Sequence, residues 1–179
     1  MKLTGKPSIS LIVILAILLL GAVLLPQVVS AGWHLAHGRT VNYRSWKVAV
    51  PFGWYAISRG EGMSVERMSE LPWQKNPVAT FLPVHFTKAY SFQYDLFARE
   101  QADTLRAMGY LPVEARNVQV AGKDGRCWTF DNWKNHDQLW IACIVPKDLT
   151  SADYIGNKAY ANDFFSLLTE SQHNPAATN

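Results

Sequence analysis

Two cysteines are the residues of this chain whose spacing most directly suggests chemistry. Cys127 and Cys143 are the only cysteines among the 179 residues. Each lies in a run typical of a β-strand, 126–130 and 139–145, and the stretch between the runs is polar and rich in turn-forming residues. A hairpin centred midway between the cysteines would place them opposite each other, so we expect a cross-strand disulfide. The alternative is a pair of buried free thiols.

A pair of histidines has the spacing of a metal site. His34 and His37 form a His-x-x-His pair, which on a helix would present two imidazoles on one face. No third ligand lies nearby, and no Cys-x-x-Cys accompanies Cys127 or Cys143. We therefore interpret the two histidines as solvated, and we expect neither a metal nor another cofactor.

The remaining polar candidates lack catalytic context. The serines have no Gly-x-Ser-x-Gly around them, the histidines are scattered, and aspartates are common at strand ends and turns for hydrogen-bonding reasons alone. These candidates are Ser64, Ser91, Ser151, His85, His136, His173, Asp131, Asp137 and Asp148. The turn Gly122 to Gly125 is too short for a phosphate loop. We expect no catalytic residue.

Tryptophan is the one residue type in excess, with seven in the chain. Aromatic clusters serve core packing more often than binding, so we expect most of these side chains to be buried. Trp133 is the exception, because it lies in the polar turn between Asn132 and Lys134. An exposed indole there would mark an interaction tip.

Hydrophobic periodicity predicts an α+β domain that carries these residues. We expect a helix from Phe92 to Met108, capped by Ser91 and ended by Gly109, because its apolar residues recur every three or four positions. A second helix is expected over 158–169. Strands are expected at 40–43, 46–50, 54–58, 63–68, 79–86, 114–120, 126–130 and 139–145, with a short extended piece at 152–155.

An unbroken apolar run, Leu11 to Leu25, precedes the domain and follows Lys2 and Lys6. Its length lies between that of a secretory signal and that of a membrane span. Residues 29–31, Val-Ser-Ala, would suit a signal peptidase, whereas Trp33 suits an interfacial anchor. We favour an uncleaved signal anchor over 9–29; the alternative is a signal peptide removed after residue 31.

The positive charges before the run set the expected topology. The positive-inside bias leaves residues 1–8 in the cytoplasm and sends the rest across the membrane. We expect a single-pass protein of the cytoplasmic (inner) membrane or, after cleavage, a periplasmic or secreted one. Its extracytoplasmic part comprises a stem and first strand (30–45), an α/β domain (46–170) and a flexible tail (171–179). An oxidising compartment fits the disulfide.

The charge of the exported part excludes one class of partner. Removing Lys2 and Lys6 from the 17 basic residues leaves 15, against 14 acidic residues that all follow the apolar run. Charges of both signs are interspersed and no basic stripe exists. We expect no nucleic-acid partner; the expected partners are the membrane and an envelope protein.

Three short motifs point to a family. Val50-Pro-Phe-Gly-Trp54, Val120-Ala-Gly122 with Gly125, and Tyr154-Ile-Gly156 before a Phe-Phe helix span most of residues 46–170. In this respect the chain resembles the PsbP-like α/β/α sandwich, whose superfamily includes a Ran-binding nuclear import factor and bacterial envelope lipoproteins of the LpqN type. Unlike those lipoproteins, it has no cysteine after the apolar run for lipid attachment.

The resemblance implies an antiparallel sheet with packed helices and a binding or assembly role, and it transfers no active site. We therefore expect a non-catalytic, membrane-anchored extracytoplasmic domain. The alternatives are an exported hydrolase-like enzyme with an unrecognised site and a cleaved, secreted protein that binds a small ligand.

Overall fold

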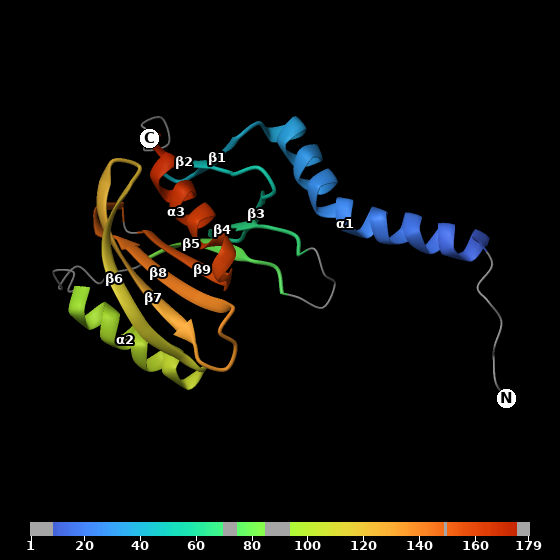
Figure 1. The fold of residues 1–179 in the computed structure, drawn as a ribbon. Coiled ribbons are helices and arrows are strands. Elements are labelled where there is room, and N and C mark those ends of the chain that lie inside the picture. The colour runs from blue at the N-terminus through green and yellow to red at the C-terminus, as the bar shows by residue number, and fades with distance from the viewer. Residues whose placement is uncertain (1–8, 70–74, 85–93, 149, 175–179) are drawn as a thin grey trace.

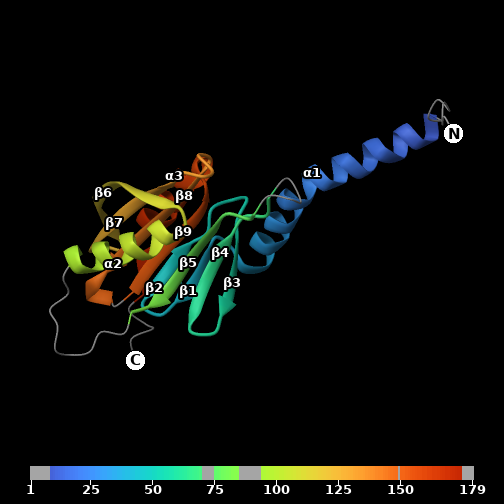
Figure 2. The ribbon, with the colours of Figure 1, turned by 90° about the horizontal axis from the view of Figure 1, so that it is seen from below.

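The chain folds into layers of helix and antiparallel sheet, from which one long helix projects (Figures 1 and 2). The computed structural model describes residues 9–69, 75–84, 94–148 and 150–174. Within them a seven-stranded sheet is covered on one face by helix α2 and on the other by helix α3 and a three-stranded sheet. The expected α+β class with antiparallel strands and packed helices is confirmed.

The large sheet is entirely antiparallel, in the order β3-β4-β5-β9-β8-β7-β6. Its strands are β3 (Tyr55–Arg59), β4 (Gly62–Glu66), β5 (Val78–Pro83), β6 (Tyr110–Val120), β7 (Lys123–Asn132), β8 (Gln138–Val145) and β9 (Thr150–Asn157). Strands that follow each other in the sequence pair with each other, except β5 and β6, and β9 lies between β5 and β8. Strand β9 therefore joins the first three strands to the last three.

The small sheet has the order β1-β2-β10, with β1 (Thr40–Tyr43), β2 (Trp46–Ala49) and β10 (Gln172–His173). Residues 172–173 belong to the expected tail (171–179), and they form the edge strand β10. Gln172 pairs with Lys47, and the amide of Asn174 donates to the carbonyl of Ser45 at 2.6 Å. The end of the described chain is held by the edge of β2.

Two hydrophobic cores fill the spaces on either side of the large sheet. Helix α2 (Tyr94–Ala107) packs Phe97 and Leu105 against β7 and β8, and Gly109, at a φ of 93°, turns the chain into β6. Helix α3 (Ala161–Glu170), preceded by the 3-10 turn Lys158–Tyr160, buries Phe164, Leu167 and Leu168 on the other face. The expected cap Ser91 lies outside the described residues.

Helix α1 (Ile9–His37) is longer than the expected span over 9–29. It is the one described helix that is long and apolar enough to cross a membrane, with a mean hydropathy of 2.8 over its most apolar window. Pro26 lies inside it, and Figure 1 shows the helix bending part-way along. Proline explains such a bend, because it lacks an amide proton and clashes with the carbonyl four residues earlier.

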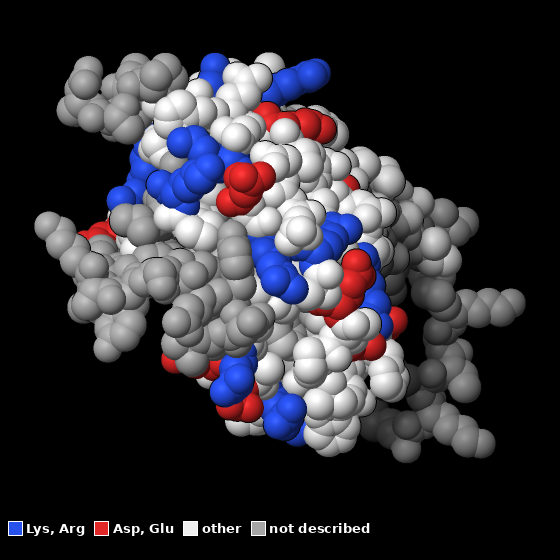
Figure 3. All heavy atoms as spheres, turned by 90° about the vertical axis from the view of Figure 1, so that its left-hand side faces the viewer, with Lys and Arg blue, Asp and Glu red and all other residues white. Residues whose placement is uncertain are grey.

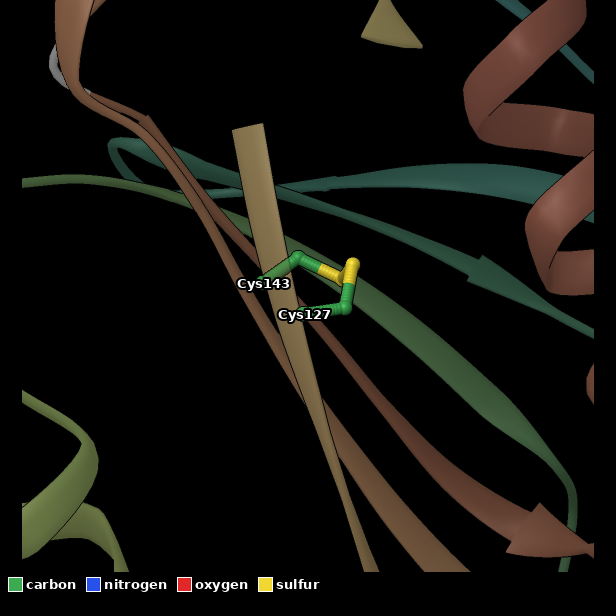
Figure 4. Close-up of a disulfide and its surroundings, with 2 residues drawn as sticks. All are labelled: Cys127 and Cys143. Carbon is green, nitrogen blue, oxygen red and sulfur yellow. A yellow bond between two sulfur atoms is a disulfide. The ribbon is translucent and has the colours of Figure 1, made fainter. Parts of the chain in front are cut away.

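Cys127 and Cys143 form a disulfide across the hairpin of β7 and β8 (Figure 4). The register pairs these two residues directly, with their Cα atoms 4.0 Å apart. Both side chains face the core under α3, where they are at most 1% exposed. The disulfide is thus a structural link and not an accessible redox site.

Removing this link should destabilise the domain. For a double variant Cys127→Ala/Cys143→Ala, we expect the free energy of unfolding to fall by about 3 kcal/mol, since the closed loop spans 16 residues. Urea unfolding followed by tryptophan fluorescence measures the change. An unchanged urea midpoint would show that the disulfide does not constrain the unfolded chain.

Candidate functional site

The last turns of α1 pack against the domain through one face of the helix. Pro26 and Ser30 are buried on this face and Trp33 is half-buried, at the i, i+4, i+7 spacing of a single helical stripe. We call these three residues the docking face. Through it the long apolar helix is joined to the start of β3 by specific contacts.

Ser30 makes the central contact of the docking face. Its side chain is 0% exposed, and its hydroxyl donates to the carbonyl of Trp54 at 3.1 Å while it accepts from the amide of Gly53 at 2.9 Å. Buried backbone groups must find such partners, because leaving one unsatisfied costs about 1–3 kcal/mol. The serine of the expected cleavage motif is therefore a structural residue here.

Trp33 and the two histidines complete the junction. The Trp33 indole donates to the carbonyl of Ala56 at 3.1 Å, and its ring stacks on His37. His34 places its ring nitrogens 2.8 Å and 3.2 Å from the carbonyls of Gly38 and Pro51. His34 thus ties the end of the helix to the turn at Pro51, whereas His37 contacts Trp33 within the helix.

The turn that receives α1 is the first motif of the resemblance. Gly53 has a φ of 91°, and a Cβ atom there would collide with the guanidinium of Arg67, so glycine is required. The next residue, Trp54, is 1% exposed, and its indole donates to the Asp163 carboxylate in α3 at 3.0 Å. The motif holds α1, β3 and α3 together.

The third motif lies beside the first. The ring of Tyr154 is 6.4 Å from that of Trp54, and its hydroxyl donates to the carbonyl of Asn157 at 2.7 Å. Burial, and after it the nearby Asp163 carboxylate, raises the pKa of Tyr154, which is therefore a neutral donor. A Cβ at Gly156 would lie 2.6 Å from the Tyr154 hydroxyl oxygen, so this glycine is required as well.

An apolar groove of about 770 Å³ lies beside the end of α1. It runs between the end of α1 and the turn at residues 51–52, and Leu35, Phe52, Arg39 and Glu170 are among its lining residues. Leu35 is 90% and Phe52 69% exposed, the two highest values among the large hydrophobic residues described. This groove was not predicted from the sequence.

Trp133, the expected interaction tip, lies in the turn between β7 and β8 and is 53% exposed. Its amide donates to the carbonyl of Gly109 at 3.1 Å, which ties the turn to the start of β6. The Lys134 ammonium lies 5.0 Å from the centre of the indole ring. In contrast, Trp46, Trp54 and Trp128 are at most 8% exposed and belong to the hydrophobic cores.

The other polar candidates are dispersed over the domain. Asp131 forms an ion pair with Lys158 at 2.7 Å, while Ser64 and Ser151 lie in β4 and β9, with β5 between them. His136 and His173 lie in the β7–β8 turn and in β10; His85 falls outside the described residues. Among the described residues no three His, Cys, Asp or Glu side chains come together as a metal site.

Charged residues do not form a single-sign field on the face shown in Figure 3. Lysine and arginine side chains are interspersed with aspartate and glutamate over the part of this face that is not grey. Such a surface is typical of ordinary solvation.

Sequence reasoning missed one unusual carboxyl group. Asp153 lies in β9 and pairs with Thr80 on one side and Ala142 on the other, at the centre of the sheet. Burial raises its pKa to about 7, and the nearby indole of Trp140 lowers it in part. The sequence did not identify Asp153 as a buried carboxyl group, because residues 152–155 were expected only as a short extended piece and not as a strand inside the sheet.

Comparisons with known proteins leave the chain without an assigned family. No family model and no curated protein matches it. It is similar to the solution structure of cyanobacterial PsbP (CyanoP) from Synechocystis sp. PCC 6803, with 11% sequence identity and a TM-score of 0.47. The match covers 75% of this chain and 89% of that one.

The Ser30 contact can be tested directly. For Ser30→Ala we expect hydrogen exchange at the Gly53 amide to accelerate about fivefold or more, because leaving a buried amide unsatisfied costs at least about 1 kcal/mol. Amide exchange of the full chain in detergent measures this. Ser10→Ala, on an exposed position of the same helix, is the control; equal exchange in both variants would contradict the assignment.

Asp153 predicts a pH-dependent stability. Its pKa is about 7 in the folded chain and 3.8 when solvated, so the folded state binds more protons between these values. Stability should therefore fall as pH rises from about 4 to about 7, by at most about 4 kcal/mol, and then level off.

The variant Asp153→Asn isolates this contribution. We expect it to be more stable than the native protein at pH 8 and to lose most of the decline between pH 4 and 7. Urea unfolding of the full chain at a series of pH values measures both effects. A decline of the same size in the variant would assign the pH dependence to other groups.

Proposed function

We propose that this chain is a membrane-anchored extracytoplasmic protein with a non-catalytic binding or assembly role. In this proposal α1 remains uncleaved and spans the cytoplasmic membrane, while residues 38–174 form the exported domain. Trp133 is the tip through which the domain binds an envelope protein.

The observation that carries the proposal is the docking of α1. A signal peptide is removed and has no part in the mature fold. Here Ser30 satisfies two buried backbone groups of the domain, and Trp33 satisfies a third. Cleavage after Ala31 would remove Ser30 and leave the amide of Gly53 and the carbonyl of Trp54 without this partner.

The disulfide supports an extracytoplasmic location. Bonds such as Cys127–Cys143 persist on the oxidising side of the membrane and are rare in the cytosol. The two positive charges before α1, Lys2 and Lys6, favour the same orientation.

Trp133 supports a binding role. Large aromatic side chains are frequent among the residues that dominate protein interfaces. Its turn is tied to Gly109, and the exposed apolar residues Met108, Leu111 and Val113 lie on the chain just beside that glycine. An apolar surface of this kind fits a protein partner better than a soluble substrate.

Cross-linking in intact membranes, followed by purification and mass spectrometry, tests both parts of the proposal. We expect the extracted protein to retain residues 1–31, and Trp133→Ala to lower recovery of a cross-linked envelope protein about tenfold or more, as for a central interface residue. Leu82→Ala is the matched control, because Leu82 is 43% exposed at the opposite end of the sheet.

Two results would contradict the proposal separately. A mature N-terminus at Gly32 would exclude the anchor. Equal recovery with Trp133→Ala and Leu82→Ala would exclude Trp133 as the binding tip.

A further inference from the structure

The end of α1 carries an apolar face that the domain does not cover. Val28, Ala31 and Leu35 follow the i, i+3, i+7 spacing of one stripe, and Val28 is 64% exposed. This stripe lies on the side of the helix opposite the docking face. One face of the last turns is therefore fixed to the domain, while the other continues the apolar surface of the proposed span.

Phe52 extends this surface onto the domain. It occupies the turn that receives α1, and its ring stacks on His34 with the ring centres 5.9 Å apart. Leu35 and Phe52 line the same groove of about 770 Å³. The end of the helix and the turn that contains Phe52 therefore form one continuous apolar surface.

The bend in α1 keeps this surface near the plane in which the span ends. Leu35 is seven residues beyond Val28, about 10 Å along a straight helix. The interfacial layer of a bilayer is about 5–7 Å thick on each side. Figure 1 shows the last turns running across the direction of the first part, so the end of the helix lies nearer to the plane in which the span ends than it would in a straight helix.

We propose that Leu35, Phe52 and the groove between them rest in the interface of the bilayer, so that the domain is seated on lipid and not held away on a stalk. This inference rests on the proposed function, because it requires α1 to span the membrane. The occupant of the groove is phospholipid of the outer leaflet of that membrane.

The lining of the groove fits lipid. Leu35 and Phe52 offer apolar contact to the upper acyl chains, as in helices that lie in the interface. Arg39 is an exposed cation at the same groove and is placed to meet lipid phosphate, whereas Glu170 adds one carboxylate to the lining. The continuity of the stripe with the span favours lipid over a separate soluble protein.

Site-specific fluorophores on the full chain test the proposal. Both native cysteines are in the disulfide, so single cysteines placed as Leu35→Cys or Phe52→Cys can be labelled selectively. The labelled proteins are reconstituted into nanodiscs of phosphatidylcholine with a minority of phosphatidylglycerol. Quenching is then compared between lipids that carry a spin label near the head group and lipids labelled at the acyl-chain end.

Two further labelled positions provide a control away from the groove and a reporter of the membrane span. Val113→Cys is the matched control, because Val113 is 66% exposed and lies on β6, the opposite edge strand of the sheet from β3. Leu18→Cys lies in the middle of the apolar run and reports on the span itself.

We expect head-group spin labels to quench positions 35 and 52 about twofold or more above position 113, as for side chains about 5–10 Å into the interface. Position 18 should respond most to labels at the acyl-chain end. Quenching at 18, with 35 and 52 equal to 113, would overturn the seating while leaving the anchor intact. No lipid quenching at 18 would overturn both. Protection of 35 and 52 from an aqueous quencher without lipid quenching would assign the groove to a protein and overturn the proposal.

Discussion

The burial of Trp54 is the constraint on which the arrangement of this protein depends. Its indole donates to Asp163, its ring lies against Tyr154 and Tyr160, and its carbonyl accepts from Ser30. One residue thus connects α3, the central strand β9 and the apolar helix α1. Because the preceding Gly53 has no side chain, Arg67 can approach closely and lie over Tyr160 at 4.5 Å, which closes the aromatic cluster from outside.

Much of the large sheet could be predicted because its strands carry strong local signals. The strand-like runs that contain Cys127 and Cys143, with a polar turn midway between them, were enough to predict the register of β7 and β8. Strand β9 carried a weaker signal, because its central position depends on pairing with β5 and β8 and not on an apolar run. Likewise Gln172 and His173 are polar, and they form a strand only because β2 offers a free edge.

In the candidate site, too, features with a local sequence signal could be predicted, and features that depend on distant residues could not. The exposure of Trp133 followed from its position in a polar turn. In contrast, Ser30 could only be read as part of a cleavage motif, because its partners are backbone groups of Gly53 and Trp54, more than 20 residues away. Asp153 was missed for a related reason, since its raised pKa arises from burial in the assembled sheet.

The position of the disulfide has a consequence for the order of assembly. Cys127 and Cys143 point into the core that Phe164 and Leu168 close, and in the finished protein they are shielded from solvent. A thiol oxidase therefore has access to them only before α3 packs. Because α3 follows both cysteines in the chain, a polypeptide that enters the oxidising compartment from its N-terminal side presents the thiols before the segment that will cover them. In the proposed export, the order of the sequence would thus leave time for oxidation of the two thiols before α3 covers them.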